Sequence, residues 1–191
     1  MDQSLHYTPA DLAQSLVSCS TMNEPKAVVD FCVGDGRLLA AASVRWPATD
    51  FYANDIDANV ALRLGSLRIK QLTFLDFLSS SCLEEFRSSR FDVILLNPPF
   101  STPGRKKWQP IGRYSEVDCS LSMAFVLTAL SFLEEDGEIL AILPASSMVS
   151  EIDRDARDII NDHFEIDVLS APAAGLFPNI SASVYTLRLI N

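Results

Sequence analysis

The sequence predicts an α/β protein with a doubly wound, mostly parallel sheet, and three features indicate this class. Apolar runs of strand length alternate with segments of helical pattern along the chain. Gly34 and Gly36 separate the first strand from the helix after it. The polar turn Asn97-Pro98-Pro99-Phe100 directly follows the apolar run Phe91–Leu96. Because ligands bind beyond the carboxyl ends of the strands in open α/β sheets, we expect the functional site at these turns.

The first half of the chain predicts alternating helices and strands. Thr8 is a suitable cap for the first helix, because its hydroxyl can accept a backbone N–H and the proline after it has none to satisfy. In order, the expected elements are a helix at Pro9–Ser18, a strand at Ala27–Phe31, a helix from Arg37, a strand from Phe51 to the acid Asp55, and a strand at Gln71–Leu75.

The second half continues this alternation. Gly137 is expected to end a long apolar helix, and Pro144 to stop the strand that follows it. In order, the expected elements are a strand at Phe91–Leu96, a helix at Leu121–Leu133, a strand at Glu138–Leu143, a helix from about Arg154, and strands at Ile166–Leu169 and Val184–Ile190.

The glycine pair predicts that a nucleotide-like ligand approaches the backbone closely. Asp55 follows about twenty residues later, where dinucleotide-binding folds place the acid that binds ribose hydroxyls. A dinucleotide fingerprint would need a third glycine at the position of Leu39, and a P-loop would need Gly-Lys followed by Ser or Thr. The sequence has neither, so these two ligand classes are set aside.

The motifs resemble, in type and order, those of the S-adenosylmethionine-dependent N6-adenine DNA methyltransferases in which the cofactor motifs precede the catalytic motif. The resemblance covers nearly the whole chain and rests on His6-Tyr7-Thr8-Pro9, Asp30 to Gly36, Asp55, Asp76, Asn97-Pro98-Pro99-Phe100 and Phe177-Pro178-Asn179. It implies a Rossmann-like fold with a seven-stranded sheet and S-adenosylmethionine as cofactor. Phe31 and Val33 depart from the pattern, because the family favours smaller residues at these positions.

The resemblance also implies roles for individual residues. The cofactor-binding set is Tyr7, Thr8, Pro9, Asp30, Cys32, Gly34, Gly36, Asp55, Ile56, Asp76 and Phe77. Asp55 would bind the ribose and Asp76 the amino group of the cofactor, while Ile56 and Phe77 would lie against its adenine ring. Asn97, Pro98, Pro99 and Phe100 would form the catalytic motif, and Phe177 would contact the flipped base.

The catalytic turn suits a particular chemical problem. The exocyclic N6 of adenine is a poor nucleophile because its lone pair is delocalised into the ring. The side-chain oxygen of Asn97 and the carbonyl of Pro98 would accept both N6 hydrogens and direct the lone pair at the methyl group. Such catalysis works by positioning and electrostatics and needs no titrating base. Phe100 would stack on a base taken out of the duplex.

The net charge of −10 opposes binding to a polyanion through the overall field. A local exception follows the catalytic turn, where positive charges and an aromatic residue gather at Arg105, Lys106, Lys107, Trp108 and Arg113. We expect this segment to contact phosphates of DNA, with Trp108 near the extruded base. A solvated connecting loop is the alternative interpretation. Because the rest of the chain is acidic, we expect a separate recognition subunit or self-association to supply much of the DNA binding.

Several other classes are excluded by the residues present. None of Cys19, Cys32, Cys82 and Cys119 follows a proline, which argues against a cytosine-C5 enzyme, and none forms a Cys-x-x-Cys pair. His6 and His163 are too scattered for a metal site. No apolar run reaches the roughly 20 residues needed to span a bilayer, and the N-terminus has no signal-peptide pattern, which predicts a cytoplasmic protein. With 48% hydrophobic residues, residues 1–191 are expected to form one catalytic domain without a separate target-recognition domain.

Two alternatives to an adenine DNA methyltransferase stay open. A planar amide poses the same lone-pair problem as adenine N6, so the turn is also compatible with methylation of a glutamine side chain in a protein, or of a base in RNA. The acidic charge favours a protein substrate, whereas Tyr7-Thr8-Pro9 and Phe177-Pro178 favour DNA. The third possibility is a module that binds cofactor or a partner without turnover, which the intact Asn97 and Asp55 argue against.

Overall fold

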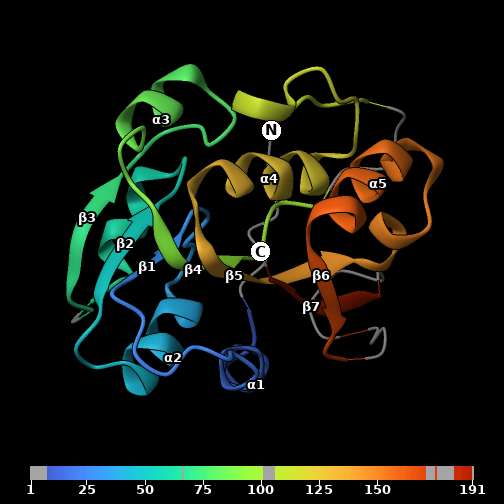
Figure 1. The fold of residues 1–191 in the computed structure, drawn as a ribbon. Coiled ribbons are helices and arrows are strands. Elements are labelled where there is room, and N and C mark those ends of the chain that lie inside the picture. Colours follow the sequence, from blue (N-terminus) through green and yellow to red (C-terminus); the bar gives the residue numbers. More distant parts are fainter. Residues whose placement is uncertain (1–7, 66, 101–105, 171–174, 176–182, 191) are drawn as a thin grey trace.

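The structure is a computed structural model that describes residues 8–65, 67–100, 106–170, 175 and 183–190. Its strands are β1 Ala27–Asp30, β2 Asp50–Asn54, β3 Ile69–Thr73, β4 Phe91–Leu96, β5 Leu133–Pro144, β6 Glu165–Val168 and β7 Val184–Ile190. They form one seven-stranded sheet in the order β3-β2-β1-β4-β5-β7-β6 (Figure 1). β1 to β5 pair in parallel, and β7 runs antiparallel to both β5 and β6. The predicted seven-stranded, mostly parallel sheet is therefore confirmed.

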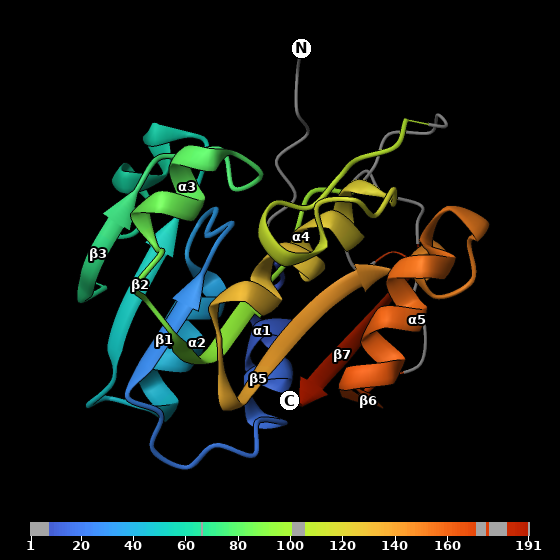
Figure 2. The same ribbon diagram turned by 45° about the horizontal axis from the view of Figure 1, so that its top comes forward.

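Helices cover both faces of the sheet (Figures 1 and 2). They are α1 Ala10–Ser18, α2 Arg37–Arg45, α3 Ser80–Glu85, α4 Leu121–Ala129 and α5 Arg154–His163. α1 and α2 lie on one face, and α3, α4 and α5 lie on the other (Figure 2). The strand order reverses between β1 and β4, so the turns that follow these two strands lie side by side, which is where such sheets bind ligands.

The face under α4 has a core of packed aromatic rings centred on Phe31. Its ring stacks on Phe77, with centroids 4.3 Å apart, and meets the edge of Phe86 at 5.3 Å. Phe132 lies 5.2 Å away, in a tilted arrangement. All four rings are buried. The large residue at position 31 is therefore explained by packing, since it fills space between neighbouring phenylalanines.

Several predicted boundaries match the structure, and one segment differs. β4, β7 and α5 begin where expected, but α4 ends at Ala129 and a 3-10 turn continues only to Phe132. Gly137 does not end that helix. It lies within β5, where the pairing with β4 is irregular. Phe91 on β4 pairs with Leu133, whereas Val93, two residues later, pairs with Glu138, five residues later. The residues between form a bulge that favours glycine, because a Cβ at position 137 would lie 2.8 Å from Leu133 Cδ1 and 3.0 Å from the Glu134 carbonyl oxygen.

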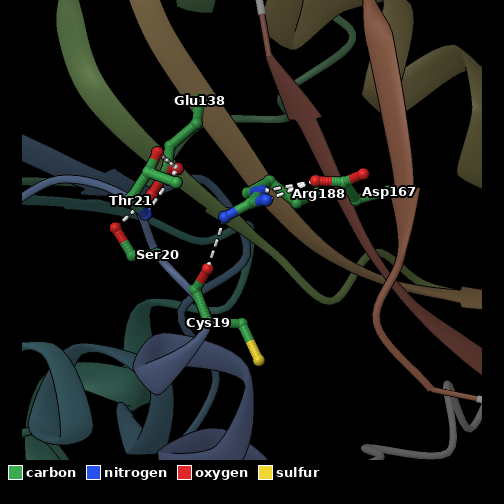
Figure 3. A network of polar contacts seen from close by, with 6 residues as sticks. All are labelled: Cys19, Ser20, Thr21, Glu138, Asp167 and Arg188. Carbon is green, nitrogen blue, oxygen red and sulfur yellow. Dashed lines mark hydrogen bonds and ion pairs between the residues drawn. The ribbon is translucent and has the colours of Figure 1, made fainter.

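The C-terminal end of α1 is fixed to the sheet by two charged side chains (Figure 3). Glu138 on β5 is fully buried and accepts hydrogen bonds from the Ser20 hydroxyl and from Thr21, whose N–H and hydroxyl lie 3.1 and 2.8 Å away. Arg188 on β7 donates to the Cys19 carbonyl at 2.7 Å and pairs with Asp167. Buried charges that lose a partner are costly. These contacts therefore hold α1 in one position along the sheet.

Candidate active site

The residues that follow β1, β2, β3 and β4 meet at the carboxyl edge of the sheet. These strands are neighbours in the order β3-β2-β1-β4, so their ends form a continuous row. The row contains most of the described residues that the sequence motifs single out. Among the described residues there is no cluster of three metal-ligating side chains, and no helix has the length and apolar character to cross a membrane.

The turn after β1 has the backbone conformation that its glycines permit. Gly34 has φ 54° and Gly36 has φ 78°, in the left-handed region that favours glycine. Gly36 is the N-cap of α2, so the turn leads directly into the helix. The Gly34 N–H donates to the Asp55 carboxylate at 2.9 Å, which joins the turn to the end of β2.

Three acidic residues lie at or just after the ends of β1, β2 and β3 in the same local arrangement. Each carboxylate accepts the backbone N–H two residues further on: Cys32 to Asp30 at 3.0 Å, Asp57 to Asp55 at 2.9 Å, and Leu78 to Asp76 at 3.0 Å. This contact is an Asx turn, which orients the side chain. Carboxylate oxygens keep further lone pairs, so each acid can still accept hydrogen bonds from a ligand.

Asp30 differs from the other two acids because it is buried. Asp30 is 1% exposed, and its pKa is raised from 3.8 to about 8, mainly by this burial. Among the smaller contributions to this value, the Cys32 N–H lowers the pKa, and the nearby carboxylates of Asp55 and Asp35 raise it. A carboxyl with this pKa holds a proton at neutral pH. A cationic ligand group beside it would favour its ionised form.

Asn54 connects these loops, although no sequence motif pointed to it. It is fully buried at the end of β2, and its amide donates to the carbonyls of Phe31 at 3.2 Å and Leu75 at 3.0 Å. Its oxygen accepts the Leu75 N–H at 3.1 Å. The one signal in the sequence is a polar residue at the end of an apolar strand. Asn54 thereby fixes the loops after β1 and β3 relative to each other.

The catalytic turn is held by contacts from three other segments. The Asn97 side chain donates from Nδ2 to the Thr8 hydroxyl at 2.9 Å. The Ser122 hydroxyl, at the start of α4, donates to the Pro99 carbonyl at 3.1 Å. The backbone N–H of Asn97 contacts the Cys32 sulfur, which opposes the rise in the Cys32 pKa caused mainly by burial. The glycine turn and the catalytic turn are thus in direct contact.

The structure changes the expected role of Thr8. Pro9, not Thr8, is the N-cap of α1, and no side chain caps this helix. Thr8 is buried, with 5% of its surface exposed, and its hydroxyl contacts Asn97 instead. The motif at the N-terminus and the catalytic turn are therefore brought together, although 89 residues separate them in the sequence.

The apolar residues assigned to the site lie in different surroundings. Ile56 is 60% exposed beside Asp55, where a flat ligand ring can pack on it. Phe100 is half-buried against the core beneath α1 and α2. Phe77 is 2% exposed and its ring stacks on Phe31, so it packs in the core, and its predicted contact with the cofactor stays a prediction. Its ring serves the core, because a larger residue at position 31 needs a partner.

The segment after the catalytic turn is attached to α4. Trp108 and Cys119 form a β-bridge, with N–H to carbonyl distances of 2.8 and 2.9 Å. The Ile111 N–H donates to the buried Thr128 hydroxyl on α4 at 3.1 Å. These contacts attach the segment along α4, with Trp108 next to the start of the helix and Ile111 next to its last turn.

The positive charges of this segment have different partners. The Lys106 ammonium lies 3.8 Å from the centroid of the Trp108 ring, a cation–π contact that occupies one ring face. Lys107 forms a 3.0 Å ion pair with Asp118. Arg113 is exposed and lies 5.3 Å from the Tyr114 ring centroid. Tyr7, Arg105 and Phe177 lie outside the described residues, so their predicted roles stay predictions.

Comparison with solved structures shows which proteins share this fold. The chain resembles a modification subunit assigned to a type I restriction enzyme from Vibrio vulnificus YJ016, with TM-score 0.78 and 17% identity over 99% of this chain and 45% of that one. A type I restriction-modification methyltransferase subunit from Streptococcus thermophilus gives TM-score 0.76 and 20% identity over 97% of this chain and 44% of that one. The chain thus spans less than half the length of either.

A third solved structure, of a protein assigned as a methyltransferase and complexed with SAH, gives TM-score 0.58 and 16% identity over 93% of this chain and 48% of that one. At these identities the likeness concerns the fold. The family model for the methyltransferase small domain matches residues 10–166, which include the glycine turn, Asp55, Asp76 and the catalytic turn. The chain belongs to the methyltransferase small domain family.

Proposed function

We propose that this S-adenosylmethionine-dependent methyltransferase acts on the exocyclic N6 of adenine in DNA. The observation that carries the proposal is the position of Asn97. Its amide lies at the end of β4 beside the glycine turn, and its Nδ2 is engaged by Thr8. The Oδ1 atom is therefore the part of the amide that is directed away from Thr8 and available to a substrate amino group.

The residues at the ends of β1, β2 and β3 fit S-adenosylmethionine. Asp55 suits the ribose because its carboxylate accepts hydrogen bonds from hydroxyls, and the exposed Ile56 next to it suits the adenine ring. Asp76 is exposed and accepts from an amino group in the same way. The positive φ of Gly34 and Gly36 lets the backbone approach the ligand. The bound cofactor supplies an electrophilic methyl group.

The catalytic turn would act on the substrate nitrogen without a base. Asn97 Oδ1 and the Pro98 carbonyl accept one hydrogen each and orient the lone pair. Pro98 is buried and its φ is fixed by the ring, so its carbonyl is preorganised. Preorganised acceptors of this kind stabilise the charge that develops on the nitrogen as the new bond forms. As the substrate nitrogen gains the methyl group that the cofactor would supply, one of the N6 hydrogens held by these acceptors would be lost to solvent as a proton.

DNA as substrate is supported by two further observations. The fold is shared with modification subunits of restriction systems, although at low identity. Lys106 and Arg113 are exposed on a segment that is attached to α4, the helix whose Ser122 contacts the catalytic turn. Because the net charge is −10, we propose that residues 1–191 form the catalytic domain and that a recognition subunit, or a second copy, contributes most of the DNA binding.

The acidic charge keeps one alternative open, which is methylation of a glutamine amide in a protein. The two substrates are separated by incubating the protein with S-adenosylmethionine carrying a labelled methyl group and with DNA, RNA and protein pools side by side. We expect label in DNA, recovered as N6-methyladenine after digestion. Label in protein only would replace the substrate and keep the fold and cofactor. Absence of label from every pool, in the presence of co-purifying partners, would contradict turnover.

A further inference from the structure

We propose that Thr8 is a positioning residue for Asn97 and not a cofactor ligand. Its hydroxyl, which accepts from Asn97 Nδ2, would hold the amide in the orientation that leaves Oδ1 to accept a hydrogen bond from the substrate. The inference rests on the proposed function, because it assumes that Asn97 Oδ1 accepts a hydrogen bond from the amino or amide nitrogen of the substrate. It concerns a residue to which the sequence motif assigns a different role.

The two ends of an asparagine amide have opposite hydrogen-bonding character. Oδ1 accepts and Nδ2 donates, and they point in different directions from the same carbon. The Thr8 hydroxyl accepts from Nδ2 at 2.9 Å. If the amide group rotated by half a turn, Nδ2 would take the place of Oδ1 and face the substrate nitrogen, which itself carries hydrogens. Two donors would then oppose each other, so only the orientation held by Thr8 supports the transfer.

Thr8 can impose this orientation because it is itself held. Its carbonyl accepts a hydrogen bond from Arg37 Nη1 at 3.1 Å, and the Arg37 guanidinium also pairs with Asp35 at 2.7 Å. Pro9 follows, which restricts the backbone of Thr8. A side chain that is 5% exposed also has little freedom to turn toward another partner.

α1 supports the same position from its far end. Glu138 and Arg188 fix the residues that follow α1 to β5 and β7 (Figure 3). The helix between these contacts and Thr8 is nine residues long, or roughly 14 Å. The catalytic amide is therefore oriented by a segment that is attached to the sheet at one end and to the glycine turn, through Arg37, at the other.

The test compares Thr8→Val, which keeps the shape but removes the hydroxyl, with Thr8→Ser, which keeps the hydroxyl. Thr49→Val is the matched control, because it removes a part-buried hydroxyl that donates to the Pro25 carbonyl at 2.7 Å, outside α1 and the site. At saturating cofactor and DNA we expect kcat of Thr8→Val to fall roughly 3- to 10-fold, the range for one net hydrogen bond. The dissociation constant for S-adenosylmethionine should stay unchanged, and Thr8→Ser should recover most of kcat.

Two outcomes would overturn the inference. In the first, Thr8→Val weakens cofactor binding and its rate recovers at high cofactor concentration, which would make Thr8 a cofactor ligand. In the second, Thr8→Val and Thr49→Val have the same small effect on kcat, which would make the Thr8 contact structural only.

A measurement without substrate separates this inference from the proposed function and needs no variant at position 8. The Asn97 side-chain amide resonances of the wild-type protein are assigned by their loss in Asn97→Ala. We expect one Nδ2 proton to exchange slowly with solvent, because it is bonded to the buried Thr8. Rapid exchange of both protons would overturn the inference even if methyl transfer to DNA is found. Slow exchange would support it even if the substrate is a protein.

Discussion

The acidic loops and the catalytic turn lie at the same edge of the sheet but are held in different ways. Asp30, Asp55 and Asp76 each accept the N–H two residues further on, so their side chains are oriented by their own loops. Asn97 is oriented by a residue 89 positions earlier, and the Pro99 carbonyl by one 23 positions later. Each acid therefore has a contact within its own loop, with Asp55 also accepting the Gly34 N–H, whereas the contacts of the catalytic turn come from distant segments.

This difference has a physical consequence. A local turn survives when distant contacts change, because its hydrogen bond closes a short ring of atoms within one loop. A side chain held by distant segments loses its orientation when any of those segments moves. We therefore expect that cofactor binding and methyl transfer respond to different substitutions, and that each can be removed without the other.

The largest effect is expected at Asn97. Asn97→Ala removes the acceptor for the substrate nitrogen, and loss of one preorganised group of this kind typically lowers the rate by about 10²–10³. Steady-state methyl transfer measures the rate, and calorimetry should give unchanged affinity for S-adenosylmethionine. The exposed Asn59 provides the control, since Asn59→Ala should behave as wild type. Turnover close to wild type in Asn97→Ala would remove the chemistry from this turn.

The next effect concerns Asp55. Asp55→Ala removes the proposed partner of the ribose and the acceptor of the Gly34 N–H. Charge-assisted hydrogen bonds contribute about 1.5–3 kcal/mol, so we expect cofactor affinity to fall by roughly 10- to 100-fold in calorimetry. Asp50→Ala, at the exposed opposite end of β2, is the matched control and should bind normally. Equal affinity of the two variants would exclude Asp55 from the site.

Asp30 predicts a pH dependence of stability. Its pKa is about 8 in the folded protein, against 3.8 for an exposed carboxyl, so between these values the folded state binds more protons than the unfolded state. Stability should therefore fall as pH rises from about 4 to about 8, by up to about 1.4 kcal/mol per pH unit from this group. Asp30→Asn should be flatter over this range when unfolding is followed by denaturant titration. Parallel profiles for the two proteins would argue against the raised pKa.

The smallest effect is expected from the basic segment. Lys106 and Arg113 are exposed, whereas Lys107 is paired with Asp118. Replacing Lys106 and Arg113 by Ala should weaken DNA binding by the active assembly and lower the logarithmic salt slope by about 0.9 for each lost phosphate contact. Lys107→Ala should change the slope less. A titration over several salt concentrations that gave the same slope for all three proteins would make the segment a connector only.

The same contrast explains which parts of the molecule could be predicted. The strand at Phe91–Leu96 and the glycine turn follow from local patterns, and the mostly parallel sheet from the alternation of strands and helices. The contacts of Thr8 and Ser122 depend on segments far apart in the sequence, and nothing local indicates them. The motif position of Phe77 does not indicate that its ring packs on Phe31 in the core, because this contact joins two segments that are far apart in the sequence. Gly137 was misassigned because a bulge and a helix end both favour glycine.

One titration tests the separation of binding and catalysis most directly. The rate of methyl transfer is measured against S-adenosylmethionine concentration, up to saturation, for wild type, Asp55→Ala and Asn97→Ala. We predict that Asp55→Ala approaches the wild-type rate at high cofactor concentration, whereas Asn97→Ala saturates normally at a rate about 10²–10³ lower. If Asn97→Ala recovered its rate as cofactor concentration rose, or if saturated Asp55→Ala stayed as slow as Asn97→Ala, the division between binding loops and catalytic turn would be contradicted.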